Sequence, residues 1–457
     1  TLSLPSDDEP FELPRWPEFL PAIDLPMTIA VDQLQIKQLQ MIEKIEQKLF
    51  VRYAFEYGNR LPKLNIEKLD SYYLPELVNR FFDISGLQKS LHKLLVDIPA
   101  AIIQVVLGTI LLAFYHPLFI AFGIFLFVIV GLILKFTSSS GFKTSMEASD
   151  NKYKVAAWLE EIARSIRSFK YAKESNFHIL KTDELVNDYL TAKTKHFKVL
   201  KLQYWSLIAF KILIVACMMI IGVSLLLDQQ INIGQFIAAD IVIIAIIGSV
   251  EKLILNLEQI YEALTSVEKL NKVATAEMET SGSQILEEKQ QGLTIEFENV
   301  DFKYESQNET LANINFKIRP SQWVQLVGKS GSGKSTILRL LTGAFRSFTG
   351  KILIDNLPLK NYNNQSLRNQ TGLLLSQQDI FFGTLLQNIT MGIKGFETSE
   401  ILSIAELTGL IKFIQSNENG LESLIDPIGK RLSSEIRHDI LLTRAIMGKN
   451  RLSLLED

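Results

Sequence analysis

Apolar residues in the first half of the chain gather into four long stretches. Together these stretches hold one charged residue, Asp240, and they cover residues 98–114, 117–134, 212–227 and 229–250. A helix rises about 1.5 Å per residue, so each stretch is near the length that crosses a bilayer if the helix continues beyond it. Buried helical hairpins of a large soluble protein are the alternative, but such helices rarely stay uncharged for so long. The pattern predicts four membrane spans, at about residues 98–115, 117–135, 207–227 and 231–250.

The residues before the first span divide into two segments. Residues 1–30 hold six of the 13 prolines and the acidic run Asp7–Glu9, so we expect a Pro-rich extended segment over residues 1–31. From Asp32 to about Tyr57, apolar residues recur at helical spacing among Gln, Lys and Glu, which predicts a helix.

Basic residues predict the orientation of the spans. The turns at residues 115–117 and 228–233 contain no Lys or Arg, whereas Thr137–Lys201 contains twelve. By the positive-inside rule the basic stretch is cytoplasmic and the two turns face outward. The chain after the fourth span is then cytoplasmic as well.

The pattern changes after the fourth span. Residues 276–292 contain a Ser-Gly pair and a run of Glu, Lys and Gln, which is typical of a linker. Leu293–Glu298 alternates with period two, which predicts an antiparallel strand, and strands and helices alternate from there on. We expect a multi-domain fold, an α-helical membrane domain over residues 32–275 followed by an α/β domain over residues 293–457.

Composition excludes several classes of protein. A length of 457 residues fits two or three domains, and the formal net charge of −3 gives no reason to expect a nucleic-acid partner. The single cysteine, Cys217, excludes a disulfide framework or a cysteine-based metal site within one chain. The five histidines form no cluster with ligand spacing.

The clearest chemical signal is a loop that fits the pattern G-x-x-x-x-G-K-[ST] and comprises Gly328, Lys329, Ser330, Gly331, Ser332, Gly333, Lys334, Ser335 and Thr336. Backbone N–H groups of such a loop wrap phosphates, Lys334 reaches the β- and γ-phosphates, and the Ser335 hydroxyl ligates Mg²⁺. The apolar run Trp323–Val327 predicts a buried strand before the loop, and Thr336–Leu341 predicts a helix after it. This context favours a phosphate-binding loop over an unliganded glycine turn, with ATP and Mg²⁺ as the expected ligands.

Further features follow in a fixed order around this loop. They are the aromatic Tyr304, the loop residue Gln377, the Leu432-Ser433 start of a helix-like stretch, and the apolar strand Leu452–Leu455 closed by Glu456 and Asp457. The series resembles the nucleotide-binding domain of ABC transporters. With the preceding spans, residues 32–457 resemble a half-transporter of the ABC exporter type, near the toxin- and peptide-secretion branch.

The resemblance implies roles for single residues. Tyr304 would stack on adenine, although a core aromatic is the alternative. Gln377 would ligate Mg²⁺ or the attacking water; a plain polar loop residue is the alternative, and Gln378 is a rival for the position. Glu456 would hold Mg²⁺ through water, and Asp457 would polarise the attacking water.

Two departures from the family pattern concern hydrolysis. The family usually ends the strand with Asp then Glu, whereas this chain has Glu456 then Asp457, and the shorter Asp457 would reach less far. The family signature LSGGQ reads Leu432–Ile436 here. The resemblance implies that Ser433 contacts the γ-phosphate bound to the opposite subunit, and Glu435 would repel that phosphate.

The family has six spans and a later switch histidine. The four spans therefore correspond to the third through sixth, and we expect a fragment at both ends rather than an abbreviated protein.

Coupling helices that dock on the nucleotide domain are expected at Leu74–Asp83 and near Phe169–Phe177. In the first of them Phe81 and Phe82 would be anchors, or the stretch is an ordinary turn. Asp240 would line a polar path or pair with a structural partner such as Lys211 or a serine in a neighbouring helix.

The resemblance implies an ATP-hydrolysing membrane exporter subunit whose partners are a second half-transporter, membrane lipid and an unidentified substrate. Its expected location is a cell membrane, the bacterial inner membrane, with the nucleotide domain cytoplasmic. The alternative is a hydrolysis-poor ATP-binding subunit that supports a competent partner.

Overall fold

The computed structural model describes residues 20–69, 74–173, 175–304, 310–376, 378–426, 432–448 and 450–456. Its contacts divide the chain into two units. The first unit comprises residues 1–62 and 72–276, and the second comprises residues 63–71 and 277–457. The second unit is therefore built from two separate parts of the sequence.

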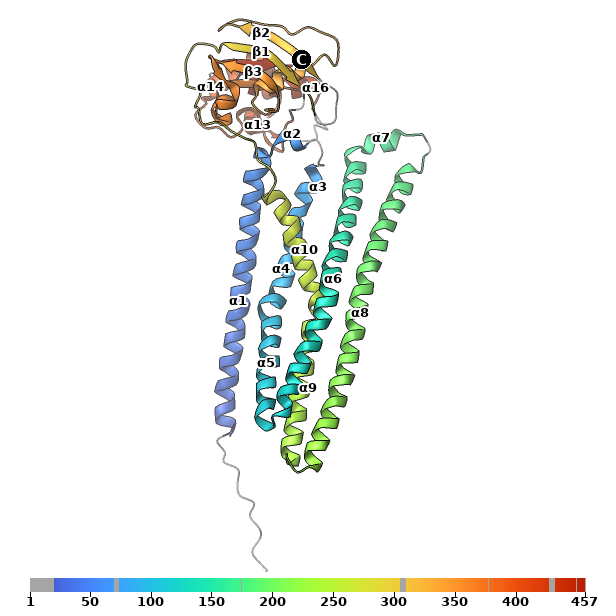
Figure 1. The fold of residues 1–457 in the computed structure, drawn as a ribbon. Helices are drawn as coiled ribbons and strands as arrows, with labels where there is room; N and C mark the ends of the chain where they lie inside the picture. Colours follow the sequence, from blue (N-terminus) through green and yellow to red (C-terminus); the bar gives the residue numbers. More distant parts are fainter. Residues whose placement is uncertain are drawn as a thin grey trace, which may run out of the picture. The chain divides into compact units, whose positions relative to one another are not determined.

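The first unit is helical (Figure 1). Its helices are α1 (Leu20–Arg60), α3 (Leu74–Asn79), α4 (Asp83–His92), α5 (Ile98–Tyr115), α6 (Leu118–Arg164), α7 (Ile166–Tyr171), α8 (Phe177–Leu227), α9 (Ile233–Leu255) and α10 (Leu257–Ala274). Short turns of helix join some of them, at Leu61–Lys63, Arg80–Phe82 and Lys93–Asp97. Within the described residues, four continuous helical stretches are long and apolar enough to cross a membrane, and they contain α5, α6, α8 and α9. The four expected apolar helices are confirmed.

The turns between α5 and α6 and between α8 and α9, which we expect to face outward, have simple local causes. Pro117 follows His116, whose backbone is extended, and it lies at the N-terminus of α6, where a missing N–H costs nothing. Asn232 begins α9 with a capping box, because its side chain accepts a hydrogen bond from the Gln235 amide (2.8 Å) and Gln235 returns one to Asn232 (2.9 Å).

The start of α1 corrects one expectation. We expected residues 20–31 to be extended, but α1 begins at Leu20. Pro21 lies in the first turn, where the amide that proline lacks has no partner within a helix. The rest of the Pro-rich segment lies outside the described residues.

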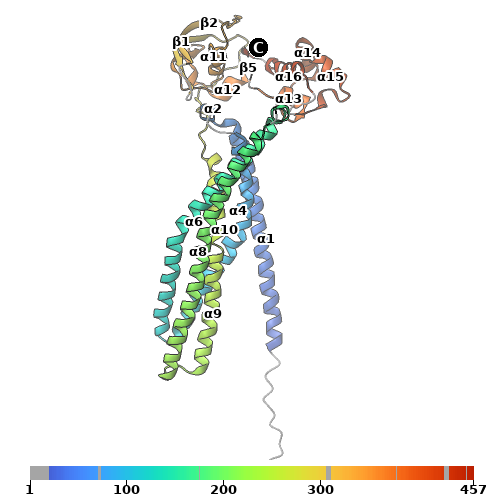
Figure 2. The ribbon, with the colours of Figure 1, turned by 90° about the vertical axis from the view of Figure 1, so that its right-hand side faces the viewer.

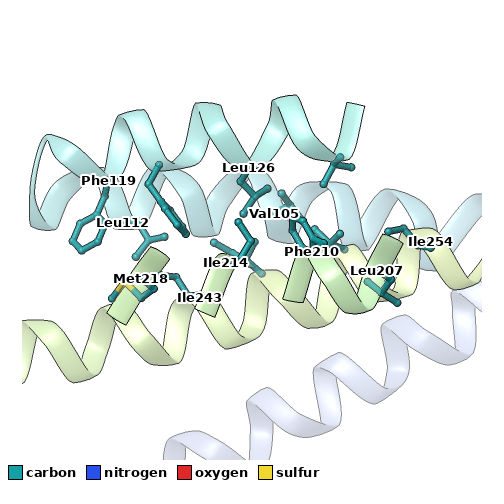
Figure 3. Close-up of a cluster of buried hydrophobic side chains, with 14 of the residues drawn as sticks. Val105, Leu112, Phe119, Leu126, Leu207, Phe210, Ile214, Met218, Ile243 and Ile254 are labelled. Carbon is teal, nitrogen blue, oxygen red and sulfur yellow. The ribbon is translucent and has the colours of Figure 1, made fainter. Parts of the chain in front are cut away.

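The core of the first unit, which we call the membrane unit, lies where α5, α6, α8 and α9 meet (Figure 3). Leu112, Phe119, Ile214 and Ile243 are at most 1% exposed and come from the four different helices. Gly222 allows close approach, since a Cβ there would lie 2.5 Å from the ring of Phe236. Such small residues permit tight packing between membrane helices.

The described residues of the second unit form three separate sheets. In the largest sheet β1 (Ile295–Phe302) lies between β2 (Leu311–Ile318) and β3 (Thr349–Ile354), all antiparallel, and β4 (Leu357–Pro358) pairs with β3. β5 (Thr371–Leu374) is parallel to β8 (Leu452–Leu455), and β6 (Gly383–Thr384) is antiparallel to β7 (Leu424–Ile425). Strands occur at both expected places, residues 293–298 and 452–455, and the first strand is antiparallel as expected.

Helices surround these strands (Figure 2). They are α2 (Ile66–Leu69), α11 (Lys334–Leu341), α12 (Asn364–Asn369), α13 (Leu385–Thr390), α14 (Thr398–Thr408), α15 (Ile411–Ser416) and α16 (Ser434–Ile446), with 3-10 turns at Leu359–Asn361 and Gly420–Glu422. The expected helix after the phosphate-binding loop is α11. One buried cluster joins β1, β2, β3 and α11, and another joins α13, α14 and α16.

The expected strand at Trp323–Val327 is wrong. Residues 322–329 have no regular structure, and Trp323 and Val327 are 99% and 84% exposed. An apolar run becomes a strand only when a neighbouring strand takes its backbone hydrogen bonds. None of the strands in the described part of this unit pairs with these residues.

The segment that contains α2 is anchored to the rest of the second unit. Leu64 forms an antiparallel bridge with Met278, at the start of the linker. The Glu67 carboxylate accepts hydrogen bonds from the amides of Arg346 and Ser347, the latter at 3.0 Å. The loop after α11 is therefore held by a residue from a distant part of the sequence.

Candidate functional site

The phosphate-binding loop leads directly into α11. Gly331 and Gly333 have φ angles of +82° and +84°, which favour glycine, and a Cβ on Gly333 would lie 2.5 Å from the Leu311 side chain. The Lys334 ammonium donates to the carbonyl oxygens of Gly328 (2.9 Å) and Lys329 (3.0 Å). An ammonium has three donors, so Lys334 both holds the loop closed and keeps a donor for an anion.

Glu456 connects this loop to the residue that precedes Gln377. Its carboxylate accepts hydrogen bonds from the Ser335 hydroxyl and from the Ser376 amide (2.9 Å). Burial alone would raise the pKa of Glu456, but the bonds from Ser335 and Ser376 outweigh it, and the pKa lies below its ordinary value. The carboxyl group is therefore ionised at neutral pH.

The donor set fits Mg²⁺, which prefers oxygen ligands and commonly shares them with phosphates. The Ser335 hydroxyl and the Glu456 carboxylate supply two such oxygens from neighbouring elements. Among the described residues no group of three or more His, Cys, Asp or Glu could hold a metal ion alone. A Mg²⁺ ion here would depend on phosphate or water oxygens for its other ligands.

Tyr304 lies in an aromatic cluster. Its ring meets Phe302 and Phe345 edge to face, at centroid distances of 5.0 Å and 5.7 Å. Its hydroxyl lies 3.3 Å from the Thr336 hydroxyl and accepts a bond from Arg339 at 3.4 Å. These contacts fit the alternative role as a core aromatic, and they also hold the ring beside the first turn of α11.

Other expected site residues are only partly described. Gln377 and Asp457 lie outside the described residues. The rival Gln378 closes its own turn, since its side-chain oxygen accepts from the Leu375 amide at 3.2 Å. Ser433 caps α16 by accepting from the Ile436 amide (3.2 Å), and Glu435 is exposed in the first turn.

Sequence reasoning missed two arginines of α16. Arg437 forms an ion pair with Asp379, and Arg444 donates to the backbone oxygens of Asn388 (2.7 Å) and Asp379 (3.2 Å). They fix the segment that follows Gln377. Their spacing of seven residues puts them on one face of the helix, a signal visible in the sequence.

Comparison with known proteins decides the family. Residues 59–250 match the family described as the ABC transporter transmembrane region, and residues 311–457 match the family described as ABC transporter. The chain belongs to the ABC transporter family.

Relatives of this ABC transporter chain include exporters. A putative export ATP-binding/permease protein of Rickettsia felis is 28% identical over 320 residues, 68% of this chain and 55% of the relative. The alpha-hemolysin translocation ATP-binding protein HlyB of Escherichia coli O157:H7 is 32% identical over 238 residues, 52% of this chain and 33% of the relative. The chain thus spans about half or less of the length of these relatives.

A solved structure shares the fold. The structure of a bacterial Atm1-family ABC exporter with ATP bound has a TM-score of 0.76, covering 93% of this chain and 76% of that chain, at 18% identity. The chain therefore combines the helical membrane domain and the nucleotide-binding domain of an ABC exporter fold.

A short helix occurs at the first place expected for a coupling helix, α3 at residues 74–79, and its docking role stays a prediction. Phe81, expected as an anchor, instead packs on Phe50 and Tyr57 inside the first unit, with ring centroids 5.3 Å and 5.6 Å away. The ring of Phe81 is thus used within its own unit, because α1 lies beside it. A short helix does occur at the second place, α7, between the long helices α6 and α8.

Of the alternatives for Asp240, the pairing with Lys211 is wrong, and the polar path stays a prediction. Lys211 forms an ion pair with Glu251 at 2.7 Å, which uses the lysine that we considered as a partner. Asp240 is half-buried in α9 and forms no hydrogen bond or ion pair within the described part of the chain.

Proposed function

We propose that this chain is a subunit of a dimeric, ATP-driven membrane exporter. The observation that carries the proposal is the pair of hydrogen bonds that Ser335 and Ser376 donate to the Glu456 carboxylate, next to a phosphate-binding loop. These bonds connect the loop, the end of the strand β8 and the segment that ends at Ser376.

In the proposed site Lys334 binds the β- and γ-phosphates, and the amides of the loop bind the phosphate chain. Ser335, and Glu456 through water, would hold Mg²⁺, which when bound would offset charge on the β- and γ-phosphates. Asp457 and Gln377 orient the attacking water, and Tyr304 contacts adenine. Ser433 of each subunit meets the γ-phosphate bound by the other, so that two nucleotides close the dimer.

Closure then moves the spans. We propose that the segment around α2, which directly follows α1 in the chain, and the helix α7 transmit this movement to the membrane helices. The nucleotide-binding domain lies in the cytoplasm, and the membrane is the bacterial inner membrane. The hydrolysis-poor supporting subunit is the second candidate, favoured by Glu435 and by the Glu456-Asp457 order.

The two lysines of the loop provide a matched test on the full-length protein. We expect Lys334→Ala to weaken ATP binding about ten- to a hundredfold, because an ionic hydrogen bond to phosphate is lost. Lys329→Ala, which removes the neighbouring lysine, should change it little. Binding is measured by equilibrium titration with Mg-ATP, and turnover by phosphate release. Equal affinity in wild type and Lys334→Ala would reject the assignment of the site, and binding without turnover in the wild type would favour the second candidate.

A further inference from the structure

The helices α6 and α8 run side by side in opposite directions (Figures 1 and 2). Two contacts fix their register. The Gln203 amide donates to the Thr137 hydroxyl (3.0 Å), and Lys195 pairs with Glu147 (2.8 Å). Lys135 on α6 therefore lies level with residue 205 on α8.

Four exposed lysines lie between this level and that of Lys143, which is opposite residues 197–199 of α8. Lys135 and Lys143 belong to α6, and Lys198 and Lys201 belong to α8; we call these four the lysine collar. No Asp or Glu occurs in residues 135–146 or 189–227. Within the part of the chain that the structure describes, no collar lysine forms an ion pair, whereas the nearby Lys195 and Lys211 do. Within these two segments no carboxylate offsets the charge of the collar, and the nearest one along α6, Glu147, is already paired with Lys195.

The collar lies at the end of the apolar part of both helices. Residues 118–134 of α6 are uncharged, and on α8 the only charge in residues 206–227 is the paired Lys211. Two exposed aromatic side chains mark the boundary, Phe136 (76% exposed) and Trp205 (61% exposed). Trp and basic residues are enriched where membrane spans meet the headgroup layer.

One face of α8 continues this order into the apolar region. Lys198, Lys201, Trp205, Ile208 and Ile212 follow one another at steps of three and four residues, which places them along one side of the helix. All five are exposed. From one end to the other the face presents cations, an indole, and then aliphatic side chains, which is the order of phosphate, glycerol ester and acyl chain in a phospholipid.

We propose that the lysine collar binds the phosphate of an anionic phospholipid, with Trp205 at the level of its glycerol esters and its acyl chains along Ile208 and Ile212. A zwitterionic lipid carries a cationic amine beside the same phosphate and is disfavoured by the four lysines. Each basic residue near an anionic membrane surface strengthens binding by about fivefold. The inference rests on the proposed function only in requiring that α6 and α8 cross a membrane.

Quenching of Trp205 fluorescence tests the proposal in the full-length protein. Substitution of every other tryptophan of the full-length protein by Phe, Trp16, Trp158 and Trp323 among them, leaves Trp205 as the reporter. The protein is reconstituted in mixed vesicles in which either phosphatidylglycerol or phosphatidylcholine carries brominated chains. We expect brominated phosphatidylglycerol to quench Trp205 beyond its mole fraction, and high salt to weaken this preference.

Paired charge variants give the decisive comparison. Lys198→Gln with Lys201→Gln, and separately Lys135→Gln with Lys143→Gln, should each lower the preference by fivefold or more. Lys170→Gln with Lys173→Gln removes the same charge near α7 and should leave it unchanged. Quenching that follows mole fraction in the wild type, or an equal loss in the control, overturns the proposal. Absence of quenching by both lipids also overturns the proposal, because Trp205 would then not lie in the membrane. Titration of the same samples with Mg-ATP tests the nucleotide site separately.

Discussion

At the scale of single residues, Glu435 has opposite effects on the helix and on the proposed dimer. In the first turn of α16 a carboxylate is favourable, because the helix N-terminus carries partial positive charge. Burial and, next, the Glu435 carboxylate raise the pKa of Asp439, one turn further along the helix. In the closed dimer the same carboxylate would face a γ-phosphate. Helix stability and ATP closure therefore make different demands on this position.

We expect Ser434→Gly with Glu435→Gly to raise ATP hydrolysis by the full-length protein, because the repulsion is removed. Each glycine also weakens α16 by up to about 1 kcal/mol, so Glu435→Gln serves as a control that removes charge and keeps the helix. Steady-state hydrolysis is measured for all three proteins at low and high salt. Activity at or below wild type in both variants would mean that Glu435 does not limit turnover.

Prediction from the sequence succeeded where the signal is local. The helix expected after the glycine-rich loop is α11, and the helix expected to begin at Leu432-Ser433 is α16. The hydrogen bonds from Ser335 and Ser376 to the Glu456 carboxylate span about a hundred residues, and no local sequence pattern predicts them. Such contacts depend on the arrangement of strands, which the sequence indicates only coarsely.

At the scale of elements, long periodic or uncharged stretches were the most predictable. The four apolar helices and β8 occur where the pattern places them. Trp323–Val327 failed because a strand is defined by its neighbour as well as by its own residues. The short helix α2 and its anchor Glu67 were missed, since a single carboxylate on a four-residue helix gives no periodic signal.

The anchor can be tested by hydrogen exchange. We expect Glu67→Ala to speed exchange of the Arg346 and Ser347 amides about tenfold, because hydrogen bonds to a charged group contribute about 1.5–3 kcal/mol. Glu287→Ala removes an exposed linker carboxylate that pairs with Lys289, and it should leave these amides unchanged. Mass spectrometry of the peptide covering residues 343–348 reads out both variants. Unaltered exchange in Glu67→Ala would contradict the anchoring role.

At the scale of the whole molecule, the proposed topology puts the loop between α6 and α8 on the same side of the membrane as the nucleotide-binding domain. The two units share one chain, and every crossing of a span changes side. An even number of spans lies between the α6–α8 loop and residue 277 if α8 and α9 both cross.

Labelling with a membrane-impermeant maleimide checks this arrangement. In a Cys217→Ser background we expect Ser140→Cys and Ser399→Cys to react from the cytoplasmic side, and Gln229→Cys to react from the opposite side. All three positions are exposed. Reaction of Ser140→Cys and Ser399→Cys from different sides would exclude the topology.

The bridge between Leu64 and Met278 has a consequence for synthesis of the protein. The ribosome makes residues 63–69 before the spans α5, α6, α8 and α9, and makes their partners at residues 277–279 afterwards. The segment around Glu67 therefore lacks its partners while more than two hundred residues are translated and inserted. Assembly of the nucleotide-binding unit is therefore a late event, and its completion reports that membrane insertion has already taken place.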